Sequence, residues 1–185
     1  MTFNSLNFLV FVGIFYPTYF LLKGQAKIVF MLAASYLFYG WWDWRFLSLI
    51  VLSTTIDYFV GKRLGAENNN KKRKILLIIS VVTNLTILGT FKYLGFFAES
   101  FSELVQNFGI TPDWPTLNLI LPIGISFYTF QSLSYTIDVY RNRCRPENNL
   151  LNFACYIALF PQLVAGPIVR ATHFLPQLRK KIDFI

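Results

Sequence analysis

The sequence has few residues that bind metals or form disulfides. Its 185 residues include one histidine and two cysteines, Cys144 and Cys155. Two cysteines without a group of histidines nearby support neither a disulfide framework nor a metal site. The sequence also carries little charge, because charged residues make up 14% of it, whereas about 25% is typical of soluble domains. We therefore expect no bound metal, no bound cofactor and no ordinary soluble domain.

Apolar and aromatic side chains take the place of the missing charge. Hydrophobic residues make up 55% of the chain, which includes 20 Phe, 10 Tyr and 4 Trp. This is more aromatic surface than a soluble core of this size needs, so the composition indicates an integral membrane protein. No Lys or Arg precedes Lys23. The basic region of a cleavable signal peptide is therefore missing, and the first apolar run is expected to be a retained transmembrane helix.

Six apolar runs divide the chain, and a helix that crosses the hydrocarbon core of a membrane needs about 20 mostly apolar residues. The sequence predicts an all-α, polytopic transmembrane helix bundle with about five spans, an interfacial helix and a broken re-entrant segment. The five expected spans are Leu6–Leu22, Ile28–Trp42, Phe46–Gly61, Ile75–Phe97 and Leu117–Tyr140, and the broken run is Leu151–Val169.

The basic residues gather between these runs. The net charge is +8, and the clusters lie at 62–63, 71–74, 141–145 and 179–181. Clusters of this kind mark loops that stay in the cytoplasm, so we expect no nucleic-acid partner. If the loops at 23–27, 62–74 and 141–145 are cytoplasmic, the N-terminus lies outside the cell membrane.

The segment FAESFSELVQNFG, which follows the fourth run, has a different pattern. Phe97, Phe101, Leu104, Val105 and Phe108 fall on one helical face, and the polar residues Glu99, Glu103, Gln106 and Asn107 lie elsewhere. We interpret it as an amphipathic helix that lies in the membrane surface and ends at Gly109. The alternative is a helix packed on a neighbouring loop. The turn-rich segment TPDWP follows.

The sixth run contains Pro161, Gly166 and Pro167. Irregular backbone at membrane depth is tolerated where it is buried in protein or lines a cavity. The stretch LFPQLVAGPIVR is therefore either a kinked span or a re-entrant segment that returns to the cytoplasmic side. The re-entrant form keeps the basic tail inside and is favoured.

The fifth run is polar on one side. At about 100° per residue, Gly124, Tyr128, Gln131, Tyr135 and Asp138 fall in one stripe, and Phe127, Phe130, Leu133 and Ile137 lie outside it. The stripe is explained equally well by a helix end where Asp138 pairs with Arg141 and the tyrosines anchor at the interface, or by the wall of a polar cavity inside a larger bundle.

Two motifs resemble a known family. LPIGISFYTFQSLSYTIDVYR, followed by NFACYIALFPQLVAGPIVRATHFLPQL, is similar to the membrane-bound O-acyltransferase family, in the bacterial branch of the alginate O-acetyltransferase membrane subunit. The resemblance covers essentially the whole chain. It implies a multi-pass enzyme of the bacterial inner membrane whose helices surround a tunnel.

The resemblance also implies a reaction and partners. An acyl group from acetyl-coenzyme A or an acyl carrier, which is a substrate, enters from the cytoplasmic side. It is passed outward, with extracytoplasmic acetyltransferase partner proteins, to a cell-surface polysaccharide such as alginate.

The chain departs from the family at the catalytic histidine, which lies in the second half of a much longer chain. His173 is the chain's histidine and does not hold that position. Asp57 and Asp138, the carboxylates that look buried, both have cations nearby with which to pair. We therefore expect residues 1–185 to be the N-terminal part of one acyltransferase domain, without the catalytic half, without a catalytic residue and inactive alone.

Eight residues match the family's motifs and are candidates for the donor side of the tunnel. Arg141 and Arg170 are expected to attract donor phosphates, because the planar guanidinium can bind two oxygens at once. The alternative for each arginine is a determinant of membrane topology. The eight candidates are Gln131, Tyr135, Asp138, Arg141, Gln162, Gly166, Pro167 and Arg170.

Other function classes stay open at this point. A small membrane transport or export subunit would also need a polar-lined cavity. An assembly subunit without activity would fit the missing catalytic half.

Overall fold

The computed structural model describes residues 5–107, 122–167 and 169–179. Within these ranges the chain is helical and has no strand, which confirms the prediction of an all-α protein. The helices are α1 (Leu6–Leu21), α2 (Gly24–Asp43), the 3-10 helix η1 (Trp44–Phe46), α3 (Leu47–Ala66), α4 (Asn70–Asn107), α5 (Ile125–Tyr140), α6 (Leu150–Ala158), α7 (Phe160–Ala165) and α8 (Ala171–Arg179).

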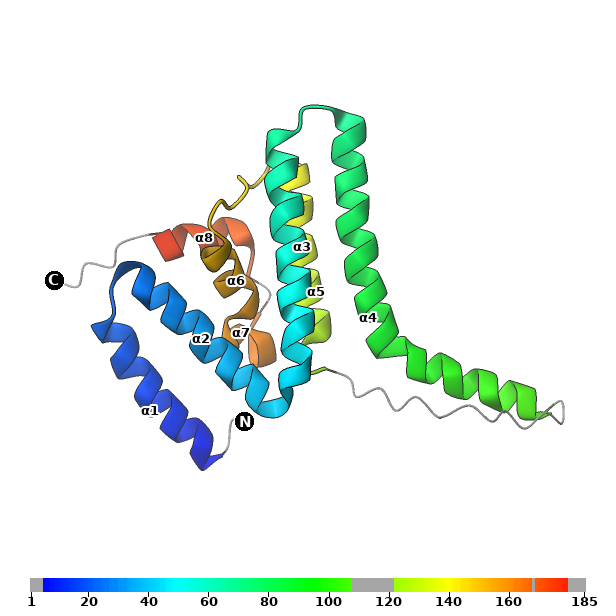
Figure 1. Ribbon diagram of the computed structural model, residues 1–185, viewed down its shortest axis with the longest axis horizontal. Coiled ribbons are helices and arrows are strands. Elements are labelled where there is room, and N and C mark those ends of the chain that lie inside the picture. Colours follow the sequence, from blue (N-terminus) through cyan, green and yellow to red (C-terminus); the bar gives the residue numbers. More distant parts are fainter. Residues whose placement is uncertain (1–4, 108–121, 168, 180–185) are drawn as a thin grey trace.

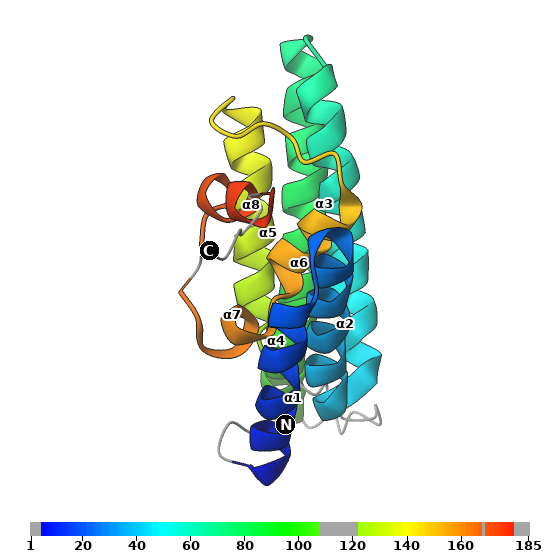
Figure 2. The ribbon, with the colours of Figure 1, turned by 90° about the vertical axis from the view of Figure 1, so that its left-hand side faces the viewer.

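Helices α3, α4 and α5 form the centre of the structure. All three pairs among them are in contact, and α3 and α5 run side by side along their length (Figure 1). Helices α1, α2 and α6 to α8 lie on the side of α3 that is opposite to α4 (Figure 1), the side that faces the viewer in Figure 2. Contacts of α6 with both α2 and α3 join the two parts.

The fourth expected span and the expected interfacial helix are one continuous helix, which corrects the prediction of two separate elements. Helix α4 has no proline and bends before its last turns (Figure 1). On this last part Phe97, Phe101 and Leu104 are exposed, as an apolar face directed at a membrane surface would be. The expected end at Gly109 and the segment TPDWP lie outside the described residues.

The polar stretch 62–74 is mostly helical rather than a loop. Helix α3 continues to Ala66 and α4 starts at Asn70, which leaves Glu67, Asn68 and Asn69 between them. The Asn69 side chain explains the early start of α4, because its Oδ1 accepts from the backbone N–H of Lys71 at 2.9 Å. This is the usual way in which an asparagine caps a helix.

Arg73 joins the ends of three helices. From the first turn of α4, its Nη1 donates to the Leu64 carbonyl in α3 at 2.6 Å, and its Nη2 donates to the Tyr140 carbonyl at the end of α5 at 2.7 Å. Nη2 also donates to Oδ1 of Asn142 at 2.9 Å. The last carbonyls of a helix lack partners within it, so one guanidinium satisfies two helix ends at once.

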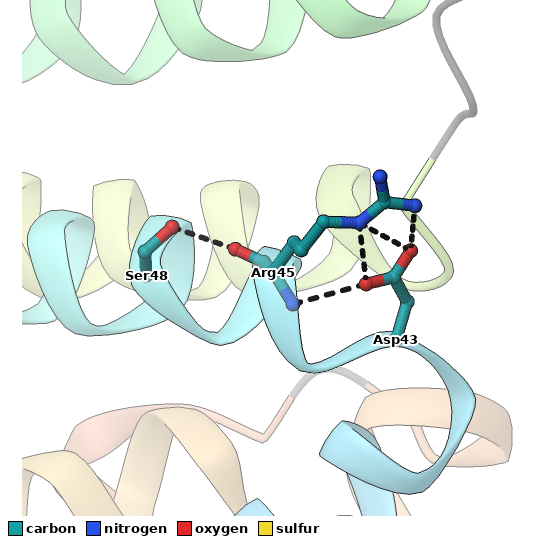
Figure 3. A network of polar contacts seen from close by, with 3 residues as sticks. All are labelled: Asp43, Arg45 and Ser48. Atoms are coloured by element: carbon teal, nitrogen blue, oxygen red, sulfur yellow. Dashed lines mark hydrogen bonds and ion pairs between the residues drawn. The ribbon is translucent and has the colours of Figure 1, made fainter.

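The turn between α2 and α3 is held by a local ion pair. Arg45 Nη2 lies 2.7 Å from Asp43 Oδ2, and Ser48 Oγ donates to the Arg45 carbonyl at 2.7 Å (Figure 3). Side-chain hydrogen bonds from Arg45 hold the pKa of Asp43 below its usual range. The turn is thereby closed by residues that are adjacent in sequence.

Aromatic rings pack α1 and α2 against α7. The Phe160 ring centroid lies 5.1 Å from that of Phe11, 5.0 Å from that of Phe15 and 5.3 Å from that of Phe38. Ser35 of α2 accepts from the Phe160 backbone N–H at 3.1 Å. These contacts fix the position at which the sixth apolar run breaks.

That run is broken, as predicted, between α6 and α7, and the chain then turns back. After α7 it returns to α8, which lies beside α6 (Figures 1 and 2). Ala171 and Leu175 of α8 are buried in the same core as Phe153 and Tyr156 of α6. This returning path is the shape expected of a re-entrant segment.

One described helix is long and apolar enough to cross a membrane by length and composition, namely α4 over Asn70–Gln106. The apolar helices Leu6–Leu21 and Leu150–Leu163 are shorter. The total of about five spans therefore stays a prediction. The first five residues of the fifth expected span, 117–121, lie outside the described residues.

Candidate functional site

The polar stripe on α5 faces the protein interior. Tyr128, Gln131 and Tyr135 are fully buried and Asp138 is 9% exposed, whereas Phe130, outside the stripe, is 48% exposed. The burial of the predicted stripe is therefore confirmed, but the sorting is incomplete, because Ser132 and Thr136 outside the stripe are also buried, and so is Leu133. Apolar residues such as Phe130 cover the opposite side of the same helix.

Gln131 and Tyr156 connect the two motifs. Gln131 Nε2 donates to the Tyr156 carbonyl in α6 at 2.6 Å. The Tyr156 hydroxyl in turn donates to the Val169 carbonyl, just before α8, at 3.0 Å. A chain of two hydrogen bonds thus runs from α5 through α6 to the GPIVR segment.

Tyr135 is held by close packing against α3 and α6. Its ring centroid lies 4.5 Å from that of Phe153, and its hydroxyl accepts from the Glu147 backbone N–H at 3.0 Å. A Cβ atom at Gly61 would lie 2.6 Å from the Tyr135 ring. Glycine at position 61 is therefore what lets the ring approach α3.

Gly124 brings the start of α5 against α7. Its φ is +77°, in the left-handed region that favours glycine, and a Cβ atom there would lie 2.6 Å from the Leu163 carbonyl oxygen. Leu163 belongs to FPQLVAG, so the second motif touches the first at this point as well as at Gln131.

The C-terminal end of the stripe differs from the prediction. Arg141 is exposed, and among the described residues the ion pairs are Asp43–Arg45 and Lys72–Glu67, so Asp138 does not pair with Arg141. The Asp138 backbone carbonyl instead accepts from the N–H groups of Arg143 and Cys144, at 2.8 and 3.2 Å. The turn after α5 leads the chain away from the position that an i, i+3 pair requires.

The candidates of the second motif lie around the end of α7. Gln162 is partly buried, and Pro167 and Arg170 are exposed. Gly166 ends α7 with its N–H bonded to the Gln162 carbonyl at 3.2 Å, and a Cβ atom there would lie 2.6 Å from Gln162 Cα. His173, on α8, is exposed.

The eight candidates do not meet at one point. Gln131 and Arg141 are ten residues apart along α5 and its end, which is about 15 Å at 1.5 Å per residue. Tyr135 and Asp138 lie between them. The structure therefore arranges the candidates along the length of α5 and around α7.

Several buried polar atoms in this region have no hydrogen-bond partner among the described residues. They include the Tyr128 hydroxyl and Gln131 Oε1 on α5 and Gln162 Oε1 on α7. Buried polar atoms are nearly always satisfied in folded proteins, so such atoms mark positions that can accept a polar ligand or water. They lie on the two helices that meet at Gly124 and Leu163.

A second polar cluster lies between α3, α4 and α5, and most of it was missed by the sequence analysis. Asp57 is fully buried, and its carboxyl is hydrogen-bonded to Ser80 at 2.5 Å, to Asn84 at 2.7 Å and to Ser132. No lysine or arginine among the described residues pairs with it. The expected pairing of Asp57 with a nearby cation is therefore wrong.

The physical reason is the length of α3. Since the helix continues to Ala66, Asp57 lies at its middle rather than near its end, and Lys62 and Arg63 are exposed beyond it. A signal for the cluster was present in the sequence. Each helix carries two polar residues four positions apart, and that spacing puts both on one face: Ser53 and Asp57, Ser80 and Asn84, and Ser132 and Thr136.

Neither cluster is a metal site of the usual kind. Among the residues that the structure describes, no group of three or more His, Cys, Asp or Glu side chains could hold a metal ion.

Known proteins resemble this chain over nearly its full length. The chain is 40% identical to the probable alginate O-acetylase AlgI of Pseudomonas aeruginosa over 98% of the chain and 35% of that protein. It is 39% identical to the Azotobacter vinelandii protein of the same name, again over 98% of the chain and 36% of the relative. It is 30% identical to the peptidoglycan O-acetyltransferase of Helicobacter pylori, over 98% of the chain and 39% of the relative.

No protein-family model matches the chain, and no solved structure matches it. The chain spans about a third of the length of the curated relatives. This similarity confirms the resemblance expected from the two motifs: over 98% of its length the chain is similar to alginate O-acetylases.

Proposed function

We propose that this chain is part of a membrane-bound enzyme that O-acetylates a cell-surface polysaccharide such as alginate. The observation that carries the proposal is the similarity to alginate O-acetylases over 98% of the chain. The more distant relative is named for O-acetylation of peptidoglycan, which is also a cell-surface polymer with sugar hydroxyls. The shared chemistry is transfer of an acetyl group to a sugar oxygen.

The reaction needs an activated acetyl donor and a base. We propose that acetyl-coenzyme A or an acyl carrier delivers the group from the cytoplasm, and that extracytoplasmic acetyltransferase partners complete the transfer. A general base must lie within hydrogen-bond reach of the acceptor hydroxyl. His173 is exposed on α8 and does not line a buried site where it could reach an acceptor hydroxyl. We therefore place the catalytic base in a part of the enzyme that this chain does not cover, and expect the chain alone to be inactive.

We propose that the chain sits in the bacterial inner membrane, in contact with lipid, as a multi-pass bundle with its N-terminus outside. Helix α4 is long and apolar enough to cross. Large apolar side chains are exposed on its sides, including Ile75, Ile78, Val82 and Leu85. Exposed apolar area of this extent is expected where lipid covers a surface.

The role proposed for the eight candidates is to line the donor side of the tunnel, where Arg141 and Arg170 supply positive charge. The unpartnered oxygens of Gln131 and Gln162 support a polar path between α5 and α7. Arg141 and Arg170 are exposed and free to meet phosphate. Either residue could equally act as a determinant of topology, so the experiment has to separate donor binding from membrane orientation.

The test is acetyl transfer in membranes that contain the whole enzyme, with labelled acetyl-coenzyme A and polysaccharide acceptor. A hydrogen bond to a charged group contributes about 1.5–3 kcal/mol when well formed and less when exposed. We therefore expect R170Q to raise the apparent KM for the donor about three- to tenfold, with kcat and topology unchanged. R145Q, which removes an exposed arginine outside the candidate set, is the matched control.

Two results would count against the proposal. If R170Q and R145Q change the donor KM equally, Arg170 has no specific donor role. If the wild-type enzyme transfers no label to any polysaccharide acceptor, the proposed reaction is wrong.

A further inference from the structure

The cluster around Asp57 lies apart from the eight candidates and has no part in the proposed acyl transfer. Asp57 is the tenth residue after the start of α3, about 15 Å along the helix axis, and its side chain is fully buried between α3, α4 and α5. Its position near the middle of α3 raises the question of what offsets its charge.

The groups that face Asp57 are neutral. Ser80 and Asn84 reach it from α4, and Ser132 reaches it from α5. Ser53 from α3 does not contact Asp57 directly, because its hydroxyl donates to Asn84 Oδ1 at 2.7 Å. An ionised carboxylate taken out of water without a cation is costly, and such groups ordinarily neutralise instead.

Hydrogen-bond counting shows that a neutral carboxyl fits. Ser80 Oγ lies 2.5 Å from Asp57 Oδ1 and 3.3 Å from Thr136 Oγ1, but a hydroxyl has one proton and can donate to one of them. If Asp57 carries a proton on Oδ1, it donates to Ser80 Oγ, and Ser80 donates to Thr136 Oγ1. Thr136 Oγ1 in turn donates a hydrogen bond to the Ser132 carbonyl at 3.2 Å, so this series of hydrogen bonds ends at a backbone acceptor.

The other carboxyl oxygen is satisfied in the same arrangement. Asn84 Nδ2 donates to Asp57 Oδ2 at 2.7 Å and Ser132 Oγ donates to the same oxygen. The orientation of the Asn84 amide is fixed, because its Oδ1 accepts from Ser53. Both carboxyl oxygens of a protonated Asp57 therefore have hydrogen-bond partners, without any cation.

We propose that Asp57 is a proton-binding site inside the α3–α4–α5 unit, which holds one proton at neutral pH. The ligand is a proton, which is bound at Asp57 Oδ1 and stabilised by the hydrogen bonds that run through Ser80 and Thr136.

Infrared spectroscopy of the purified protein in lipid nanodiscs at neutral pH tests the proposal. A protonated carboxyl absorbs at a frequency distinct from that of a carboxylate. We expect such a band in the wild type and its loss in D57N, in which the amide replaces the neutral carboxyl with nearly the same shape. D43N is the matched control and should leave the band unchanged, because Asp43 is ionised beside Arg45.

A second variant keeps the test decisive if D57N does not fold. S80A removes the acceptor of the proposed proton and should shift the band while leaving Asn84 and Ser132 in place. The proposal is overturned if the wild-type band is absent at neutral pH, or if D57N and S80A both leave it unchanged. Replacing potassium with sodium in the buffer of the infrared experiment provides a third test. Loss of the band in sodium would show that the site takes a small cation, which also overturns the proposal.

Acyl transfer is not measured in this experiment, so its outcome is independent of the proposed enzyme function.

Discussion

Several glycines in this chain are required by close approaches rather than by turns alone, and Gly61, Gly124 and Gly166 are among them. Gly61 lets the Tyr135 ring reach α3, Gly166 lies against the backbone of Gln162, and Gly124 starts α5 against the Leu163 carbonyl. Gly124 combines two demands, because its φ is also positive. A side chain at this position has to be accommodated against a backbone atom, which cannot rotate away as a flexible side chain can.

We therefore expect G124A to be destabilising. The left-handed conformation costs a non-glycine residue about 1–2 kcal/mol, and the contact of 2.6 Å with a carbonyl oxygen adds to this cost. The measurement is thermal unfolding in detergent. G13A is the matched control, since Gly13 is inside α1 and a methyl group there would have no atom within 4 Å, and it should be neutral or slightly stabilising. Equal melting temperatures for G124A and wild type would show that α5 and α7 separate easily.

At the scale of the elements, helix ends rather than helix interiors determine how α3, α4 and α5 are joined. Arg73 donates to carbonyls of both α3 and α5, and also to the side chain of Asn142. Asn142 has a φ of +58°, a conformation that asparagine tolerates better than most residues. A basic cluster that the sequence marks as a topology signal thus contains one residue with a structural role.

We expect R73Q to lower the free energy of unfolding by about 1–3 kcal/mol, because two partly buried helix ends lose charged donors. R73K, which keeps the charge but loses the planar fork, should recover part of the loss. K72Q is the control, since Lys72 makes a surface ion pair with Glu67 at 3.9 Å and such pairs contribute about 0–1 kcal/mol. Chemical denaturation in mild detergent measures all three. An effect of R73Q no larger than that of K72Q would contradict the bridging role.

At the scale of the whole molecule, the α3–α4 junction and the end of α5 lie at one end of the central helices, opposite the α2–α3 turn (Figure 1). Arg73 ties the first two together. The basic clusters at 62–63, 71–74 and 141–145 therefore share one end of the structure, which is the arrangement that the positive-inside rule requires.

Labelling in intact cells tests the orientation. In a Cys144→Ser background, with Cys155 buried, we expect Trp44→Cys to react with a membrane-impermeant maleimide from outside. Asn68→Cys should react only after the cells are permeabilised. The opposite pattern would place the N-terminus in the cytoplasm, and labelling of both positions from outside would mean that α3 does not cross the membrane.

The sequence by itself determined the helical class, the approximate bounds of α1 and α2, the start of α3, the break in the sixth run and the burial of the stripe on α5. These follow from local properties: apolar run length, proline and glycine positions, and the period of the helix. Its motifs also sufficed for the resemblance to the acyltransferases.

Only the tertiary structure decided the partners of Asp57, the role of Arg73 and the contact between Gly124 and Leu163. The sequence analysis paired both Asp57 and Asp138 with cations nearby in the chain. The structure gives Asp57 hydroxyl and amide donors from other helices, and it leaves Asp138 and Arg141 apart. The physical reason is that buried polar groups are satisfied by whichever donors packing brings within hydrogen-bond distance, and around Asp57 packing joins residues as far as 75 positions apart.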